Sequence, residues 1–333
     1  MAGYDLKEGH YEIRNISDDE LWAAFSYVFS SKSRNTTSYK YGFLKAIIDN
    51  LYNVDENLKL TFDQLFSKFG EIYWNLILKH GLRQNISTVN NGETYLEQIL
   101  HSAAAKYCIT EPIPYESLTT EMMLDISHQV KNKCKKYVVG ALFEDTNHLF
   151  YSFSKKDEWL QINPIIYEFI CKHKLIIEKL NYSRWAQFLE KINPETRTTK
   201  LINKIDESAK RNNLYKYRQI LYEEFESNTC FYCGCPLHPN KIDVDHFIPW
   251  SFIKNDNLWN LVLACPTCNR KKNDKLPDER YLPKIYNRNQ LICTGHVLKE
   301  MEYYRPQIIK HVYDWAKING YDRTWKPANS KIL

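Results

Sequence analysis

Two cysteine pairs place the strongest constraint on how this chain can fold. Cys230-Phe231-Tyr232-Cys233 and Cys265-Pro266-Thr267-Cys268 are two Cys-x-x-Cys knuckles a few tens of residues apart. Such a pair presents four thiolates tetrahedrally to one Zn²⁺. Because all four predicted ligands are cysteines and no position is left open, we expect a structural zinc. Cys235 and His238 are close enough in sequence to replace one ligand, and the spacing does not choose between these sets.

The number of cysteines and the character of residues 1–15 indicate the cellular compartment. The chain holds nine Cys, and residues 1–15 lack the apolar segment and small-residue cleavage site of a secretion signal. No stretch approaches the roughly 18 apolar residues needed to cross a bilayer. The cysteines therefore do not predict a disulfide framework, and we expect a cytoplasmic protein.

Length and charge predict two domains of different character. The 333 residues are 44% hydrophobic and 26% charged, which is typical of a folded globular protein of two domains. Asn193-Pro194 is a break signal, and we place the boundary between domains 1–198 and 199–333. Residues 199–333 carry 22 Lys and Arg against 15 Asp and Glu, whereas residues 1–198 carry 23 against 25. A basic C-terminal domain suits a polyanionic partner.

Residues 1–198 predict a mostly helical domain without a recognisable chemical motif. Ser17 and Thr61 each begin a capping box. Apolar periodicity predicts helices over about 21–29, 38–51, 61–81, 93–108, 120–135, 164–180 and 183–192. Residues 137–153, with Asp145-Thr146-Asn147 between apolar runs, predict a β-hairpin. A long amphipathic helix is predicted over about 198–226, leading into the first cysteine pair.

The residues between the cysteine pairs carry the chemistry. Ile242-Asp243-Val244-Asp245-His246-Phe247-Ile248-Pro249 predicts a short strand that delivers Asp245 and His246 to a cleft. Asn260 follows within Trp259-Asn260-Leu261-Val262-Leu263, and Asn269 directly follows the last cysteine. Two strands over about 240–263 and a helix that starts at Pro266 are expected here.

These motifs resemble the HNH (ββα-metal) endonuclease family, in the subgroup with a Cys₄ zinc site. The resemblance covers roughly residues 225–280. It implies a mainly α chain in which a helical accessory or recognition domain precedes a C-terminal ββα-metal nuclease core. The implied activity is metal-dependent hydrolysis of phosphodiester bonds.

The resemblance also assigns roles to residues. His246 matches the general base that deprotonates the attacking water, and Asp245 matches a ligand of the catalytic metal. Asn260 matches the residue that tethers the loop and orients the histidine. Asn269 matches the second metal ligand, where the family more often has a histidine. One Asp and one Asn oxygen ligand suit a single Mg²⁺ or Mn²⁺ ion, and Arg270, Lys271 and Lys272 on the following helix are candidate contacts to the DNA backbone.

The resemblance further implies double-stranded DNA as the substrate and a bacterial restriction or anti-phage defence enzyme as the setting. One alternative is a zinc-stabilised nucleic-acid-binding module without cleavage, and another is a homing-type nuclease. Residues 1–198 could recognise DNA, bind a protein partner or hold the nuclease inactive. The slightly acidic balance of this part favours a protein contact.

Overall fold

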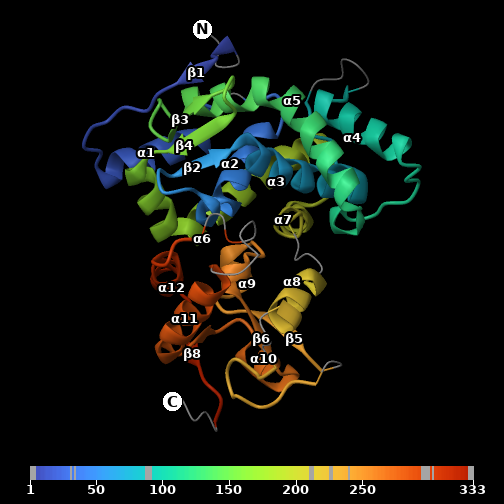
Figure 1. The fold of residues 1–333 in the computed structure, drawn as a ribbon. Helices are drawn as coiled ribbons and strands as arrows, with labels where there is room; N and C mark the ends of the chain where they lie inside the picture. Colours follow the sequence, from blue (N-terminus) through green and yellow to red (C-terminus); the bar gives the residue numbers. More distant parts are fainter. Residues whose placement is uncertain are drawn as a thin grey trace. The chain divides into compact units, whose positions relative to one another are not determined.

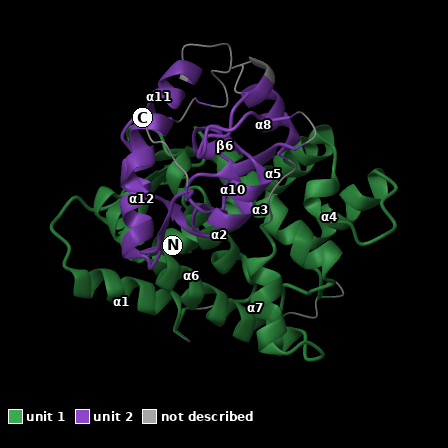
Figure 2. Cartoon of the chain, turned by 90° about the horizontal axis from the view of Figure 1, so that it is seen from below, with its two compact units in different colours: residues 1–210 green, residues 211–333 purple. Residues whose placement is uncertain are grey.

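The computed structural model divides into two compact units, residues 1–210 and residues 211–333 (Figures 1 and 2). It describes residues 5–30, 32–33, 35–86, 92–209, 214–224, 228–238, 241–293, 301 and 304–328. The division lies after the helix Thr198–Asp206, which the predicted boundary at 198/199 assigns to the second domain.

Unit 1 is mainly helical, as expected. Its helices are α1 (Asp18–Val28), α2 (Tyr39–Asp49), α3 (Phe62–Trp74), α4 (Tyr95–Lys106), α5 (Thr120–Asp145), α6 (Pro164–Ile192) and α7 (Thr198–Asp206), with short turns η2 (Leu51–Asn53), η3 (Asn75–Lys79) and η5 (Tyr115–Ser117). Helices α2, α3, α5 and α6 pack against one another around fully buried aromatic side chains such as Phe43, Phe66 and Trp185. This aromatic core holds the unit together.

Local hydrogen bonding explains where the first helices start and stop. Ser17 accepts from the backbone N–H of Glu20, and Thr61 from that of Gln64, so both predicted capping boxes are confirmed. The third helix continues through η3 and ends before Gly81, which has a φ of +64°. A residue without Cβ adopts that left-handed conformation at no steric cost, which explains the stop.

A small antiparallel sheet accompanies these helices. Its strands are β1 (Glu8–Gly9), β2 (Lys59–Thr61), β3 (Tyr151–Ser154) and β4 (Trp159–Ile162), in the order β1-β3-β4-β2. Strands β3 and β4 form the central hairpin, with Tyr151 opposite Ile162.

The predicted hairpin over residues 137–153 is wrong in its first half. Helix α5 runs to Asp145, and the hairpin lies later, from Tyr151 to Ile162. Val138, Val139, Leu142 and Phe143 are buried together because their i, i+1, i+4, i+5 spacing places them on one helical face. The same apolar run also fits a strand, since short apolar runs are compatible with both periods.

Two further predictions fail at helix boundaries. The break predicted between 180 and 183 lies elsewhere, because α6 runs from Pro164 to Ile192 and its two helical segments meet at a kink at His173. The long helix predicted over 198–226 is broken. Helix α7 ends at Asp206, where the Ser208 hydroxyl donates to the Ile205 carbonyl, and part of the predicted span lies outside the described residues. Helix α7 packs on α6, which is why it belongs to unit 1.

Unit 2 contains the two-stranded sheet and the short helix expected between the cysteine pairs. Its elements are α8 (Tyr215–Gln219), η6 (Ile220–Glu224), β5 (Asp243–His246), α9 (Trp250–Ile253), η7 (Leu258–Asn260), β6 (Leu261–Ala264), α10 (Pro266–Lys272), β7 (Leu276–Pro277), η8 (Glu279–Tyr281), α11 (Leu282–Cys293), α12 (Ile308–Ile318) and β8 (Thr324–Trp325). The antiparallel pair β5–β6 and helix α10 make a ββα unit, and β7 pairs with β8 in parallel. The fold class, mainly α with a C-terminal ββα core, is therefore as expected.

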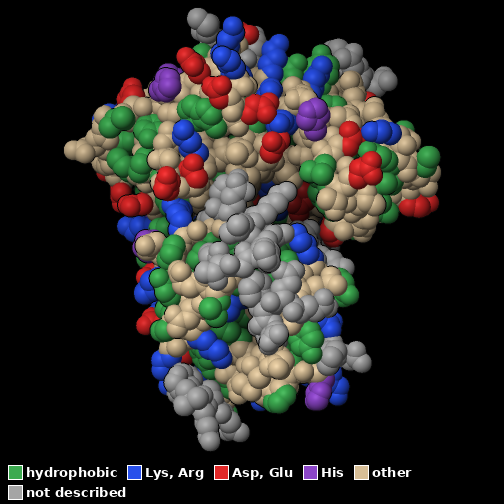
Figure 3. Space-filling view, in the orientation of Figure 1, with side chains coloured by type: hydrophobic (Ala, Val, Ile, Leu, Met, Phe, Trp, Pro, Cys, Tyr) green, Lys and Arg blue, Asp and Glu red, His purple; other side chains and the backbone are tan. Residues whose placement is uncertain are grey.

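Two further properties concern the charge on the surface of unit 1 and the apolar character of the helices. On the face in Figure 3, acidic and basic side chains lie interspersed over unit 1. Within the described part of the chain, no helix has the length and apolar character needed to cross a membrane.

Candidate active site and metal centre

Strands β5 and β6 bring the first site residues together. They pair with Asp243 opposite Ala264, Asp245 opposite Val262 and His246 opposite Leu261. Because side chains alternate along a strand, Asp243 and Asp245 lie on the same face. Helix α10 follows β6 directly, and Pro266 occupies its first turn as predicted.

His246 is buried at the end of β5 and has a carboxylate partner. Its Nε2 lies 2.8 Å from Oδ1 of Asp256, and the two side chains are 4% and 5% exposed. An ionised carboxylate only accepts hydrogen bonds, so a neutral imidazole in this pair carries its proton on Nε2. Nδ1 is then the nitrogen with a lone pair, which is the form a general base needs.

Asp245 is buried between a phenol and an ammonium group. Tyr232 donates its hydroxyl proton to Oδ2 over 2.5 Å, and Lys272 Nζ lies 3.0 Å from Oδ2 and 3.2 Å from Oδ1. Lys272 also donates to the backbone carbonyl of His246 at 2.7 Å. Since each carboxylate oxygen can accept about two hydrogen bonds or metal contacts, Oδ1 retains acceptor capacity.

Asn269 reaches back from α10 to the face of β5. Its Nδ2 donates to Asp243 Oδ2 at 2.9 Å. With the amide nitrogen engaged in this way, the amide oxygen is the part of Asn269 left to accept or to bind a cation. Asp243 therefore orients Asn269, a role that the sequence analysis did not assign.

Asn260 holds the loop that follows His246. Its Nδ2 donates to the Ile248 carbonyl at 2.9 Å, and its Oδ1 accepts from the Ile248 N–H at 2.8 Å. Its own carbonyl accepts from the Phe247 N–H at 2.7 Å. Asn260 is fully buried, so these three bonds fix the backbone directly after the histidine.

The three basic residues expected to contact DNA do not share one environment. Arg270 and Lys271 are exposed on α10, whereas Lys272 is fully buried and bonded to Asp245 and His246. The structure therefore corrects the expected surface position of Lys272. Positions 271 and 272 are adjacent in sequence but lie about 100° apart around a helix, which turns only one of them inward.

Helix α11 holds the start of β6 in place through hydrogen bonds. Arg288 donates to the carbonyls of Leu261 and Trp259, and Asn289 donates to Trp259 as well. Burial lowers the pKa of the Arg288 guanidinium to about 10, so it stays charged at neutral pH. Buried polar groups paired in this way fix the position of β6.

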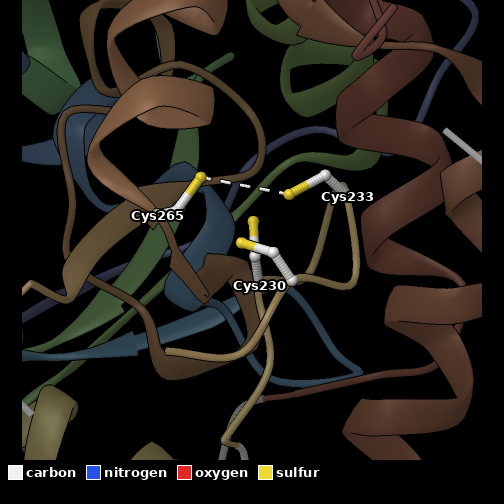
Figure 4. A group of neighbouring side chains, drawn as sticks. Cys230, Cys233 and Cys265 are labelled. Atoms are coloured by element: carbon white, nitrogen blue, oxygen red, sulfur yellow. Dashed lines mark hydrogen bonds between the residues drawn. The ribbon is translucent and has the colours of Figure 1, made fainter. Parts of the chain in front are cut away.

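The cysteines form a compact group beside this hairpin. The sulfur atoms of Cys230, Cys233, Cys235 and Cys265 all lie within 4.8 Å of one another. Those of Cys233 and Cys265 are 4.0 Å apart, and the two side chains point toward each other (Figure 4). Three of the four predicted ligands are in this group, together with Cys235. Cys268, the fourth predicted ligand, is not in this group, although its backbone N–H donates to the Cys265 sulfur at 3.4 Å.

This group is compatible with a zinc site. His238, the other alternative ligand, is exposed and is not part of the group. Four thiolates at mutual distances of this order suit a tetrahedral Zn²⁺, in which each sulfur lies about 2.3 Å from the metal. Because five cysteines gather here, which four would bind is not decided by the spacing of the two pairs.

Electrostatics within the group favour a thiolate at one position. Burial by itself would raise the pKa of the Cys233 thiol, but hydrogen bonds from the Cys235 backbone and from neighbouring thiols outweigh it and lower the pKa to about 7. Burial and the adjacent Cys233 raise the pKa of Cys235 to about 12. A zinc ion would hold all its cysteine ligands as thiolates, which these pKa values alone do not achieve.

Sequence reasoning missed Asp243 and Asp256. For Asp243 a signal was present, because it lies two residues before Asp245 and strand alternation puts the two on one face. For Asp256 only the fold supplies the information, since the loop between β5 and β6 returns it to His246.

Comparison with known proteins identifies this part of the chain. The family model described as HNH endonuclease matches residues 230–278, which include both cysteine pairs and the whole ββα unit. No curated protein matches the chain.

Proposed function

Because residues 230–278 form an HNH endonuclease domain, which makes the chain a nuclease that hydrolyses phosphodiester bonds, we propose that it cuts DNA with His246 as the general base. The observation that carries the proposal is the buried 2.8 Å pair between His246 Nε2 and Asp256. This pair leaves Nδ1 to take a proton from water as the water oxygen attacks phosphorus. Asp256 acts through His246 as a positioning residue and stabilises the imidazolium that forms.

Asp245 and Asn269 are the proposed ligands of one catalytic cation. Their contacts leave acceptor capacity on Asp245 Oδ1 and on the amide oxygen of Asn269, and this hard oxygen donor set fits Mg²⁺ or Mn²⁺. When bound, such a cation acts as a Lewis acid for the phosphoryl and departing oxygens. Asp243 holds the Asn269 amide in the orientation that this role needs.

Lys272 and Asn260 keep the site arranged. The Lys272 ammonium bonds both the Asp245 side chain and the His246 carbonyl, so it partly neutralises a buried carboxylate while joining two neighbouring site residues. Asn260 fixes the loop after His246 through both of its amide atoms. Neither residue needs to contact substrate in this proposal.

The proposed substrate is double-stranded DNA, with zinc as a structural ion in the cysteine group. Arg270 and Lys271 are exposed on α10 and suit phosphate contacts. The excess of basic over acidic residues in 199–333 favours a polyanion in the same way. We place the activity in bacterial restriction or anti-phage defence, with unit 1 as the part that recognises DNA or a protein partner.

The test is cleavage of supercoiled plasmid. Wild type is incubated with Mg²⁺ or Mn²⁺ beside an EDTA control, His246→Ala and Asp256→Asn. His311→Ala, an exposed histidine on α12, is the matched control. We expect nicking or linearisation by wild type and His311→Ala, none by His246→Ala, and a loss of about 10²–10⁴-fold for Asp256→Asn.

The pH dependence of the cleavage rate distinguishes a positioning role of Asp256 from a purely structural one. If Asp256 supports the base, Asp256→Asn should displace the acid limb of the cleavage rate as well as lower the rate. Equal cleavage by wild type and His246→Ala would overturn the role of His246. DNA binding without cleavage under every metal and substrate condition would favour a binding module instead.

A further inference from the structure

A pocket in unit 1 is bounded by Tyr41 in the first turn of α2 and by the second half of α6, and Ser30, Ser33, Asn35 and Ile86 complete its lining. Its volume is about 240 Å³, enough for a small ligand and not merely a single water. The Asn181 side chain donates to the Tyr41 carbonyl at 3.0 Å, which fixes α2 to α6 and so sets the shape of the pocket. All the residues that line it belong to unit 1.

The charge of the lining selects an anion. Arg184 and Lys191, one above the other on α6, both line the pocket, and no carboxylate is among its lining residues. Arg184 Nη1 donates to Gln187 Oε1 at 2.7 Å, but its Nε is buried without a hydrogen-bond partner among the described residues. A buried cationic N–H without an acceptor is costly, so an anionic ligand would stabilise it.

The phenol of Tyr41 adds a second donor. Its oxygen accepts from Asn35 Nδ2 at 3.1 Å, so its own proton is left for another acceptor. Burial raises the pKa of this phenol while the nearby Arg184 charge opposes the shift, and the group stays protonated at neutral pH.

The pocket also presents a hydrogen-bond acceptor and two aromatic rings, and phosphate alone would leave the rings without a contact. Asn35 Oδ1 is buried without a partner and needs an N–H or O–H from a ligand. Tyr41 and Phe188 flank the pocket with ring centroids 6.1 Å apart. Inorganic phosphate has an O–H that could reach Asn35 Oδ1 but no apolar surface, whereas a base or sugar supplies both a donor and a surface for the rings.

We propose that this pocket binds a nucleotide, that is, a phosphate attached to a nucleoside. The phosphate pairs with Arg184 and Lys191, and the nucleoside donates to Asn35 Oδ1 and lies against the aromatic walls. The nucleotide comes either from the free pool or from a DNA strand. The proposal concerns unit 1 alone and does not depend on the nuclease function of residues 230–278.

Calorimetric titration of the full chain in buffer without added Mg²⁺ or Mn²⁺, so that the metal-dependent cleavage is not supported and the proposed zinc is retained, tests the proposal. The probes are 2′-deoxynucleoside 5′-monophosphates, ribonucleoside 5′-monophosphates, unphosphorylated nucleosides, inorganic phosphate and a short single-stranded oligodeoxynucleotide. We expect a monophosphate to bind at least about tenfold more tightly than inorganic phosphate or its own nucleoside, because each alone makes only part of the contacts. Displacement of the monophosphate by the oligonucleotide identifies a strand as the source, and absence of displacement identifies the free pool.

Three variants make the result specific. Arg184→Gln and Lys191→Gln should each weaken monophosphate binding about tenfold or more. Lys172→Gln, which removes an exposed charge from the same helix outside the pocket, should leave it unchanged within about twofold. Lys191 is exposed, so its variant keeps the test valid if Arg184→Gln does not fold, which thermal unfolding will reveal. No binding of any monophosphate, equally tight binding of inorganic phosphate, or an equal loss in Lys172→Gln would overturn the proposal.

Discussion

Asn260→Ala tests whether the buried amide holds the loop after His246. Ile248 is fully buried, and its N–H and C=O both pair with the Asn260 side chain at 2.8 and 2.9 Å. Alanine leaves both backbone groups without partners. Each such group costs roughly 1–3 kcal/mol, so we expect a local destabilisation of about 2–6 kcal/mol.

Hydrogen–deuterium exchange of peptides that contain Ile248 measures this loss directly. A cost of about 2 kcal/mol, the lower bound, corresponds to roughly 30-fold faster exchange of the Ile248 amide. Plasmid cleavage should fall on the order of 100-fold, since the histidine loses its fixed position. Asn287→Ala is the control, because Asn287 is an exposed asparagine of α11 in the same unit.

Two outcomes would refute this reasoning. Exchange at Ile248 as slow as in Asn287→Ala would mean that the two hydrogen bonds contribute little to the loop. Unchanged exchange together with lost cleavage would mean that Asn260 acts on the reaction itself rather than on the loop.

Three further predictions follow from the same structure. Lys272→Met leaves the buried Asp245 without its ammonium partner, so it should destabilise the protein by about 3–5 kcal/mol, and Mg²⁺ should raise its melting temperature more than that of wild type; an equal Mg²⁺ shift in both would argue against Asp245 as a metal ligand. Purified wild type should contain one zinc per chain by metal analysis, and Cys265→Ser should lose zinc and melt at a lower temperature, whereas full zinc content in this variant would remove Cys265 from the ligand set. A hydrogen bond from Lys106 is the largest cause that lowers the pKa of Asp125 from 3.8 to about 2, so this carboxylate stabilises the fold above pH 4 and loses that effect as the pH falls toward 2. Urea unfolding should therefore show Asp125→Asn to be less stable than wild type at pH 6 and equal to it near pH 2, and a constant difference would contradict the assignment.

Local sequence determined much of the secondary structure and the family of the C-terminal unit. The capping boxes at Ser17 and Thr61 and the stop at Gly81 depend on hydrogen bonds and backbone angles within a few residues, so the chain alone specifies them. The cysteine pairs and the Asp245–His246 motif match the HNH family both in residue type and in sequence spacing. They therefore predict the HNH domain that residues 230–278 form.

Local sequence was insufficient where two periods fit the same apolar run. Residues 138–143 have β-branched and aromatic side chains typical of a strand, yet they belong to α5 because their buried face is helical. The amphipathic pattern over 198–226 likewise continues past Asp206, where α7 ends and the Ser208 hydroxyl donates to the Ile205 carbonyl.

Only the tertiary structure decided the environment of the charged site residues. Lys272 and Lys271 are equally basic in sequence, but the fold buries Lys272 against Asp245 and leaves Lys271 exposed. The loop between β5 and β6 likewise brings Asp256 to His246. A side chain's partners, and therefore its role, depend on which distant groups the fold places within about 3 Å of it, and this distance is not a local property of the chain.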